Sequence, residues 1–443
     1  MKAHLEEISP VKKKLLIEIE PEEVDRKLSE AYRELGKKAK IPGFRPGKVP
    51  RGILEGRFRK QVVEDVTKDL IKETFPKALE EVNTFPLGTP VLEKETLREG
   101  ENFKYSALME VRPEFEAKNY LGVQVEKEKC VVTEEDVLNQ LEQIRKAHGK
   151  LTSVEEERPI RRDDYVILDY EGYEGDRPLE GIKGPNFLVK VGANDFHPDF
   201  EEALIGLRRG DESEIDVSFE ETYYHSKLAG RNVKFKVKII DIKEMVLPEL
   251  NDEIVKTLGT DLKDLEDLKN HVRETVTAQE KTRIDRELKN RLIQKISKGL
   301  DIDLPQVLID SEIEQAVENL RENLERGGSS FEKSGLSEER LKESFRVPSE
   351  RRVREMLLLA QIAKQEEIEA DEKDLEEGYK EIASSIGQAP ETIKKYYEAK
   401  DLVPSLKQKL LEQKTLNYLV EYAMISEVDK ESLKENRSEE GDK

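Results

Sequence analysis

The sequence predicts a multidomain α+β protein. Its 443 residues exceed what one hydrophobic core usually organises, so about two to four domains are expected. The apolar pattern also changes twice along the chain. Residues 1–112 mix strand-like and helical periods, residues 162–245 hold short alternating runs broken by Gly, Asn and Pro, and a helical period begins at Leu247. These patterns favour an N-terminal α+β domain, an antiparallel sheet around one helix, and an all-α C-terminal domain.

The first region, residues 1–112, has the predicted order strand, helix, helix, hairpin. The run VKKKLLIEIE at residues 11–20 predicts a strand, and a helix follows from Pro21, because proline suits the first helical turn. A long second helix is predicted across residues 53–75, where apolar residues recur near helical spacing. Two alternating runs joined by REGEN within residues 91–111 predict a hairpin.

Residues 113–161 are predicted to connect the first region to the middle one. They hold a strand, VQVEKEKCVV, and a helix opened by Thr133, with Asp136 three residues later in a capping-box-like arrangement. In the middle region, residues 162–245, alternating runs surround one helical piece, PDFEEALIGL. This pattern predicts an antiparallel sheet wrapped around a single helix.

The last region, residues 246–427, is predicted to be helical. Its narrow apolar stripes suit either a solvated bundle or extended arms. From about Glu427 the chain is polar and has no sustained apolar period, so residues 428–443 are predicted to form a flexible acidic tail. Helices are expected at residues 262–298, 306–326, 337–368, 371–387 and 402–424.

Composition argues against several classes of protein. The single cysteine, Cys130, excludes an internal disulfide and suits a reducing compartment. The N-terminus has no apolar signal segment, and no uncharged apolar run approaches the roughly 20 residues of a membrane helix. We therefore expect a soluble cytoplasmic protein with no membrane partner. The five histidines are scattered without carboxylate or cysteine groups at ligand spacing, so no metal and no other cofactor is expected.

One segment reverses the sign of the charge in a chain whose formal net charge is −21. Between residues 37 and 60 there are nine basic residues and a single acid. Within this segment, IPGFRPGKVPRG places glycines on both sides of FRP, which favours a tight projecting turn with Phe44 at its tip. A solvated helix face is the simpler alternative. An exposed aromatic ring beside arginine, however, suits docking onto a protein or RNA surface.

The segment GFRPGKVP resembles the ribosome-docking loop of bacterial trigger factor, which has the pattern GFR-x-GK-x-P. The resemblance implies attachment beside the polypeptide exit tunnel, to an exit-tunnel ribosomal protein and neighbouring ribosomal RNA. Many family members have a basic residue where this chain has Pro46, so the resemblance implies either that one phosphate contact is missing or that Arg51 or Lys48 supplies it. The implied ribosome-binding residues are Gly43, Phe44, Arg45, Gly47 and Lys48.

The middle region resembles an FKBP-type prolyl isomerase domain in the segments DYVILDYEGYEGDRPLEG, NFLVKVGANDFHPDFEEALIGLRRGDESEIDV and SFEETYYHSKLAGRNVKFKVKI. Phe200 would form the pocket floor, where stand-alone enzymes usually have tryptophan and trigger factors have phenylalanine. Phe196 and His197 differ from the aliphatic pair that is more often found, and only Glu180 represents a neighbouring acid. The implied catalytic pocket is lined by Tyr170, Leu179, Phe187, Phe196, His197, Phe200, Tyr224 and Phe235.

The implied reaction, cis–trans isomerisation of X–Pro bonds, needs no nucleophile and no covalent intermediate. Rotation about an amide is resisted by roughly 18–20 kcal/mol, because the C–N bond shares the π electrons of the carbonyl. The twisted amide is less dipolar than the planar one, so an apolar aromatic cup favours the twisted form. In the family, the backbone N–H at the position of His197 holds the substrate carbonyl. Without the resemblance, aromatic residues in a small sheet would be interpreted as ordinary core.

The helical third also looks like trigger factor in LPELNDEIVKTLG, LPQVLIDSEI and RRVREMLLLAQIAKQEEIEA, so the resemblance spans residues 1 to about 425 in the family's order. It implies a helical body with two arms that enclose nascent and unfolded polypeptides. The leading hypothesis is a ribosome-associated chaperone that also isomerises X–Pro bonds. Two alternatives stay open, a free cytosolic prolyl isomerase and a scaffold with an inactive isomerase fold. A weak homodimer of the free protein also stays open.

Overall fold

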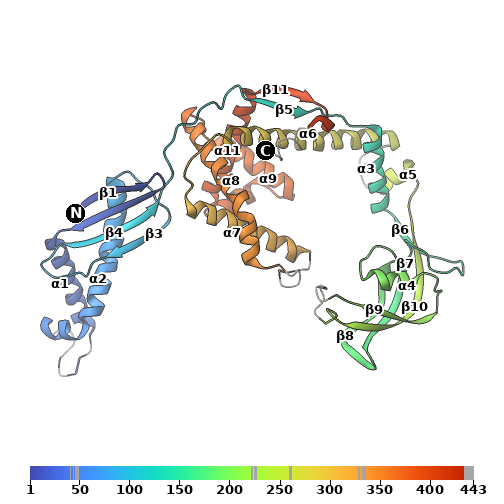
Figure 1. Ribbon diagram of the computed structural model, residues 1–443, viewed down its shortest axis with the longest axis horizontal. Helices are drawn as coiled ribbons and strands as arrows, with labels where there is room; N and C mark the ends of the chain where they lie inside the picture. Colours follow the sequence, from blue (N-terminus) through green and yellow to red (C-terminus); the bar gives the residue numbers. More distant parts are fainter. Residues whose placement is uncertain are drawn as a thin grey trace. The chain divides into compact units, whose positions relative to one another are not determined.

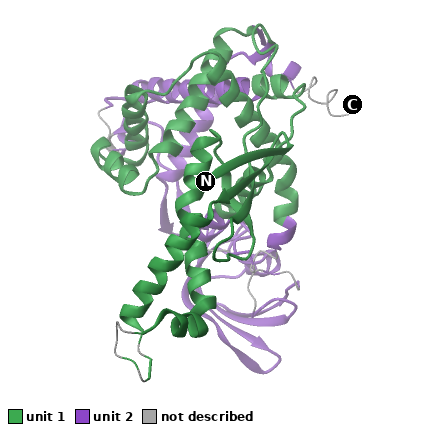
Figure 2. Cartoon of the chain, turned by 90° about the vertical axis from the view of Figure 1, so that its left-hand side faces the viewer, with its two compact units in different colours: residues 1–123, 291–320, 341–424 green, residues 124–290, 321–340, 425–443 purple. Residues whose placement is uncertain are grey.

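The computed structural model divides into two compact units, which are described separately (Figures 1 and 2). One unit contains Met1–Val123, Arg291–Leu320 and Leu341–Met424, and the other contains Gln124–Asn290, Arg321–Arg340 and Ile425–Lys443. The residues that the structure describes are 1–39, 41–42, 44, 49–220, 223, 227–258, 262–327, 330–331 and 336–433. Across these ranges, no helix is both long and apolar enough to cross a membrane.

The N-terminal module is built on a four-stranded antiparallel sheet with the strand order β1-β2-β4-β3. The predicted strand and hairpin are both present. Strand β1 is not predicted, because it is an edge strand with no fully buried side chain and therefore has little apolar pattern. The strands are β1 (Lys2–Ser9), β2 (Lys12–Ile19), β3 (Leu87–Lys94) and β4 (Phe103–Glu110).

Two helices, α1 (Pro21–Lys38) and α2 (Arg51–Glu81), pack on the apolar face of this sheet and share its hydrophobic core. Leu54 is buried while Ile53 is exposed, which fixes the rotation of α2 about its axis. Burying side chains of this size contributes about 1.5–3 kcal/mol each to folding. The core residues of the helices lie at helical spacing, with Val24, Leu28 and Tyr32 in α1 and Leu54, Val62, Val66 and Leu70 in α2.

The connector contains a strand, β5 (Gln124–Glu128), whose partner is β11 (Met424–Val428). The sequence predicts that Glu427 and Val428 belong to an untethered stretch, whereas the structure places both in β11. The Lys129 N–H donates to the Val428 carbonyl at 3.0 Å. Strand pairing of this kind uses backbone hydrogen bonds, so it does not require apolar residues at regular spacing in the sequence. The expected tail from residue 434 onward lies outside the described residues.

Helix α3 (Glu134–Ala147) follows β5 and begins with the predicted capping box. The Thr133 hydroxyl accepts from the Asp136 N–H at 3.2 Å, and the Thr133 N–H donates to the Asp136 carboxylate at 2.9 Å. The helix packs against α5 (Asp252–Thr257) and the start of α6 (Leu265–Ser297) in a small core. The buried members of that core are Val137, Leu141, Ile254, Val255, Leu268 and Val272.

The middle module is a five-stranded antiparallel sheet in the order β6-β10-β7-β8, with β9 paired to β10. A single helix, α4 (Pro198–Leu204), contributes Phe200 and Leu204 to the core of this sheet, as predicted. Strand β6 lies inside the predicted connector 113–161, yet it pairs with β10. The strands are β6 (Lys150–Ser153), β7 (Tyr165–Glu174), β8 (Arg177–Lys190), β9 (Glu212–Ser218) and β10 (Asn232–Val246).

The remaining chain is mainly helical, with α7 (Gln306–Arg326), α8 (Glu338–Gln365), α9 (Glu372–Ile386), α10 (Pro390–Ala399) and α11 (Val403–Glu421). Helix α10 is not predicted, because it has only ten residues and Ile393 is its one buried side chain, so its apolar pattern is short. The apolar run at residues 357–359 is buried within α8. Tyr396 is by contrast exposed.

Candidate functional site

The candidate isomerase site is a cluster of aromatic rings drawn from five parts of the middle module. Strand β7 supplies Tyr170, β8 supplies Phe187, and β10 supplies Phe235. Phe196 comes from the segment between β8 and α4, and Phe200 comes from α4 itself. Because strand residues two apart share a face, the sheet directs these rings toward the helix.

Phe196 is at the centre of this cluster. Its ring centroid lies 4.7 Å from that of Phe200 and 5.5 Å from that of Phe235. It also lies 5.9 Å from the centroids of both Tyr170 and Phe187. Most of these pairs meet edge to face, the arrangement that aromatic rings prefer. Five of the eight predicted pocket residues therefore form one continuous aromatic group.

The rings differ in their access to solvent. Phe200 and Phe235 are both 0% exposed, so they belong to the hydrophobic core as well as to the predicted pocket. Tyr170, Phe187 and Phe196 are only partly buried. Tyr170, Phe187 and Phe196 therefore form the solvent-accessible part of the cluster.

The other three predicted pocket residues are not among the five rings of this group. Leu179 of β8 is partly buried against the same core. His197 is the N-cap of α4, where its Nδ1 accepts from the Asp199 N–H at 3.3 Å. Its imidazole also lies 5.0 Å from the ring of Phe219. Tyr224 lies outside the described residues.

The backbone around Phe196 is held on both sides. The Phe196 N–H donates to the Glu201 carboxylate at 3.1 Å, and the Phe196 carbonyl accepts from the Tyr223 hydroxyl at 2.7 Å. The next N–H, that of His197, donates to no acceptor in the described part of the chain. An N–H beside an aromatic cup is therefore open to a substrate carbonyl.

Sequence reasoning missed two contributors to this site. Phe219 lies at the end of β9, and its ring centroid is 6.2 Å from that of Phe235. Its apolar character beside a strand end was a usable signal. Glu201 is the second contributor that was missed. No sequence signal marks it, because the pair EE in PDFEEALIGL does not distinguish the buried Glu201 from the exposed Glu202.

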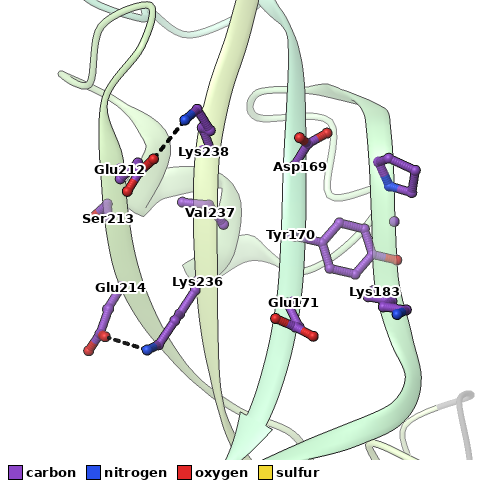
Figure 3. Close-up of a pocket in the computed structure, with 12 residues that line it drawn as sticks. Asp169, Tyr170, Glu171, Lys183, Glu212, Ser213, Glu214, Lys236, Val237 and Lys238 are labelled. Atoms are coloured by element: carbon purple, nitrogen blue, oxygen red, sulfur yellow. Dashed lines mark hydrogen bonds and ion pairs between the residues drawn. The ribbon is translucent and has the colours of Figure 1, made fainter.

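A depression of about 790 Å³ on the other face of the same sheet is a competing candidate (Figure 3). Its walls carry full charges, and two of its lysines are paired, Lys238 with Glu212 at 2.8 Å and Lys236 with Glu214 at 3.5 Å. Of the predicted pocket residues it includes only Tyr170. A less dipolar, twisted amide gains nothing from such walls, so the aromatic cluster is the better candidate for isomerase chemistry.

The second candidate site is the basic loop before α2. Phe44 is described and is 39% exposed, and its N–H donates to the Ile41 carbonyl at 3.1 Å, which makes a tight turn. The other four predicted ribosome-binding residues, Gly43, Arg45, Gly47 and Lys48, lie outside the described residues.

The helices beside the loop carry exposed cations. They are Lys37 and Lys38 at the end of α1 and Arg57, Arg59 and Lys60 in the first turns of α2.

Arg51 has two carboxylate partners, whereas among the cations just named Lys37 pairs with one carboxylate, that of Glu34, at 2.7 Å. The Arg51 guanidinium pairs with Glu55 at 2.5 Å and Glu99 at 2.6 Å, and it lies 5.4 Å from the centre of the Tyr32 ring. The hydrogen bond that Arg51 donates to Glu55 raises the pKa of Arg51. Arg51 is thus a poor substitute for the basic residue that Pro46 replaces.

Family models match three successive parts of the chain. Residues 1–144 match the bacterial trigger factor protein (TF), residues 156–240 match the FKBP-type peptidyl-prolyl cis-trans isomerase, and residues 264–421 match the bacterial trigger factor protein (TF) C-terminus. With the sheet and aromatic cluster, these matches define a multidomain folding factor with an FKBP-type isomerase module.

Curated relatives match nearly the whole chain. Trigger factor of Geotalea uraniireducens (strain Rf4) is 36% identical over 434 residues, covering 98% of this chain and 100% of that protein. Trigger factor of Halalkalibacterium halodurans is 33% identical, covering 92% of this chain and 96% of that protein. The chain belongs to the trigger factor family. It is a ribosome-associated chaperone with an FKBP-type peptidyl-prolyl cis–trans isomerase domain.

A solved structure supports the fold. It is described as "Promiscuous Substrate Recognition in Folding and Assembly Activities of the Trigger Factor Chaperone". It is 22% identical to this chain and superposes with a TM-score of 0.50, covering 95% of this chain and 99% of its own. The predicted fold class, α+β with antiparallel sheets and a helical C-terminal region, is confirmed.

Proposed function

We propose that the basic loop of residues 41–50, tipped by Phe44, docks this chaperone beside the ribosomal exit tunnel. The contacts would be a ribosomal protein for Phe44 and ribosomal RNA phosphates for the neighbouring cations. The observation that carries the proposal is an exposed phenylalanine beside exposed basic residues in a chain of net charge −21. Local positive charge attracts phosphate even where the whole molecule is acidic.

Co-sedimentation with ribosomes tests this docking. Phe44, Arg45 and Lys48 changed together to Ala should abolish co-sedimentation while isomerase turnover stays intact. Phe85→Ala is the matched control, because Phe85 is a 73% exposed phenylalanine after the other end of α2 and should leave binding unchanged. Undiminished ribosome binding by the triple variant would reject the docking role and favour a free prolyl isomerase.

The aromatic cluster is the proposed isomerase site. Tyr170, Phe187 and Phe196 would surround the proline ring, and the open N–H of His197 would hold the substrate carbonyl. The apolar surround favours the twisted amide over the more dipolar planar one, so the barrier falls by differential binding. The remaining proposed site residues are Leu179, Phe200, Tyr224 and Phe235.

Isomerisation of a chromogenic peptide with one X–Pro bond tests this site. Phe187→Ala should lower kcat/KM by about tenfold or more, because the cup loses a wall that favours the twisted amide. Leu188→Ala is the control, since Leu188 is 45% exposed and is the next residue of the same strand. Absence of turnover in the unmodified chain would instead identify a scaffold with an inactive isomerase fold.

The remaining parts of the proposal concern partners and module limits. Nascent and unfolded polypeptides would be the clients, in the cytoplasm where ribosomes are, and the free protein would form at most a weak homodimer. We propose module limits near residues 112, 161 and 246. The limits predicted at residues 245 and 427 each divide a strand, β10 and β11, so both are moved to the end of the strand.

A further inference from the structure

Glu201 is a buried carboxylate with an unusual set of partners. It lies in α4 directly after Phe200 and is 0% exposed. No basic side chain in the described part of the chain forms an ion pair with it. A buried charge is costly unless hydrogen bonds compensate it, so its partners must be strong.

The compensating donors are three backbone N–H groups of one short segment. Oε2 accepts from Gly192 at 2.9 Å and from Asn194 at 2.8 Å, and Oε1 accepts from Phe196 at 3.1 Å. Hydrogen bonds to an ionised acceptor are roughly twice as strong as neutral ones. The carboxylate therefore fixes every second peptide of the segment that leads from β8 into α4.

That segment carries the centre of the candidate isomerase site. Phe196 is the ring in contact with four others, and the open N–H of His197 follows it directly. Tyr223 holds the same peptide from the opposite loop, because its hydroxyl donates to the Phe196 carbonyl. Because the Phe196 N–H already donates to Glu201, it does not compete with the His197 N–H for a substrate carbonyl.

We propose that Glu201 is a positioning residue of the isomerase, which holds Phe196 and the His197 N–H in the geometry that the twisted amide requires. Tyr223 completes the clamp from the other side. Glu201 touches no substrate, and its effect passes through the peptide that it binds. The inference rests on the proposed isomerase site.

Glu201→Gln in the full-length chain is the main test. Glutamine preserves the volume but has one acceptor oxygen, so it opposes an N–H donor to at least one of the three backbone donors. We expect kcat/KM on the X–Pro peptide to fall by about tenfold to a hundredfold, because small displacements of positioned groups cost rate steeply. In a chain labelled with 15N-phenylalanine, the Phe196 amide resonance should also shift. Tyr223→Phe, which removes one hydroxyl, should give a smaller loss.

Asp164→Asn is the matched control. Asp164 is a buried carboxylate of the same module that also accepts from a backbone N–H, that of Arg161 at 2.8 Å, but it is bound to Arg158 and not to the aromatic segment. This variant should lower the melting temperature while kcat/KM well below melting stays unchanged. It separates general destabilisation from misplacement of Phe196.

The outcomes divide cleanly. If Glu201→Gln retains wild-type kcat/KM, or loses activity only in proportion to its unfolded fraction, the positioning role is wrong while the site stands. If Glu201→Gln does not fold, an unchanged kcat/KM in Tyr223→Phe rejects the clamp. If Phe187→Ala has no effect in the same assay, the proposed site itself fails, and the inference fails with it.

Discussion

The N-terminal and middle modules place their candidate functional residues differently relative to their cores. In the N-terminal module, Phe44 is exposed and lies outside the core that α1 and α2 form with the sheet. In the middle module, Phe200 and Phe235 are at once proposed pocket residues and fully buried core. A docking tip can be changed without loss of stability, whereas an aromatic cup made from core residues cannot.

The difference follows from what each site binds. A docking loop must reach a separate surface, so its ring has to project, and its charge is best left solvated until contact. An isomerase cup must exclude water around one amide, so its rings pack together and add to the core. Function and stability are therefore separable in the first module and linked in the second.

The largest expected effect on stability comes from removing a residue that belongs to both the proposed pocket and the hydrophobic core. Phe200→Ala should destabilise the middle module by about 3–5 kcal/mol, because it leaves a cavity where a 0% exposed ring was. Hydrogen exchange of the β7 and β10 amides measures this without assuming a single unfolding transition. A loss below about 1 kcal/mol would break the comparison, since such a small cost is typical of partly exposed positions.

A somewhat smaller effect is expected at the buried ion pair of the same module. Arg158→Ala should cost about 3 kcal/mol, because Asp164 would remain as an unpaired buried charge. Burial alone raises the pKa of Asp164, but the hydrogen bonds from Arg158 and the Arg161 N–H outweigh it and lower that pKa. Ionised Asp164 therefore stabilises the folded state at pH values above the ordinary pKa of 3.8. This contribution is lost as the pH falls from 3.8 through the lowered pKa of the folded state. Lys234→Ala, which breaks the exposed pair with Glu214, should cost far less, because water screens both charges.

Salt should affect the two modules unequally. Raising salt from about 50 to about 200 mM should weaken ribosome binding by about tenfold or more, because phosphate contacts release counterions. Isomerase turnover of an uncharged peptide should hardly change over this range, since the rings of the aromatic cluster carry no charge. Equal salt dependence of both activities would contradict the separation between a charged docking loop and an apolar cup.

The smallest expected effect is on the stability of the N-terminal module. Phe44→Ala should change its free energy of unfolding by no more than about 0.5 kcal/mol, because Phe44 is not part of the core. Hydrogen exchange of β2 and β4 amides measures it in the full-length chain. A large loss would show that the ring packs inward, and the docking proposal would then fail.

Much of the fold could be predicted from local pattern. Helical spacing identified α1, α2 and the long C-terminal helices, and Thr133 with Asp136 marked the start of α3. The three strands that were missed, β1, β6 and β11, are exposed or intermediate along their whole length, so their sequences carry no strong apolar pattern. Their positions depend on backbone pairing with distant segments.

The sequence predicted which aromatic residues form the candidate isomerase site, but not how each of them is placed. The aromatic residues were named because the resemblance assigns each of them, and the structure brings five of their rings together. The sequence could not predict that Phe200 is fully buried while Phe196 stays partly accessible, because this depends on how the segment before α4 is held.

The sequence by itself determined the module order, the family, the basic loop and the set of aromatic residues, since these are carried by composition, period and motif. Only the tertiary structure decided which of two adjacent glutamates is buried, which N–H remains open, and which rings are covered. Glu201 and Glu202 are chemically identical, and only the contacts made by long-range packing distinguish a buried clamp from a solvated side chain.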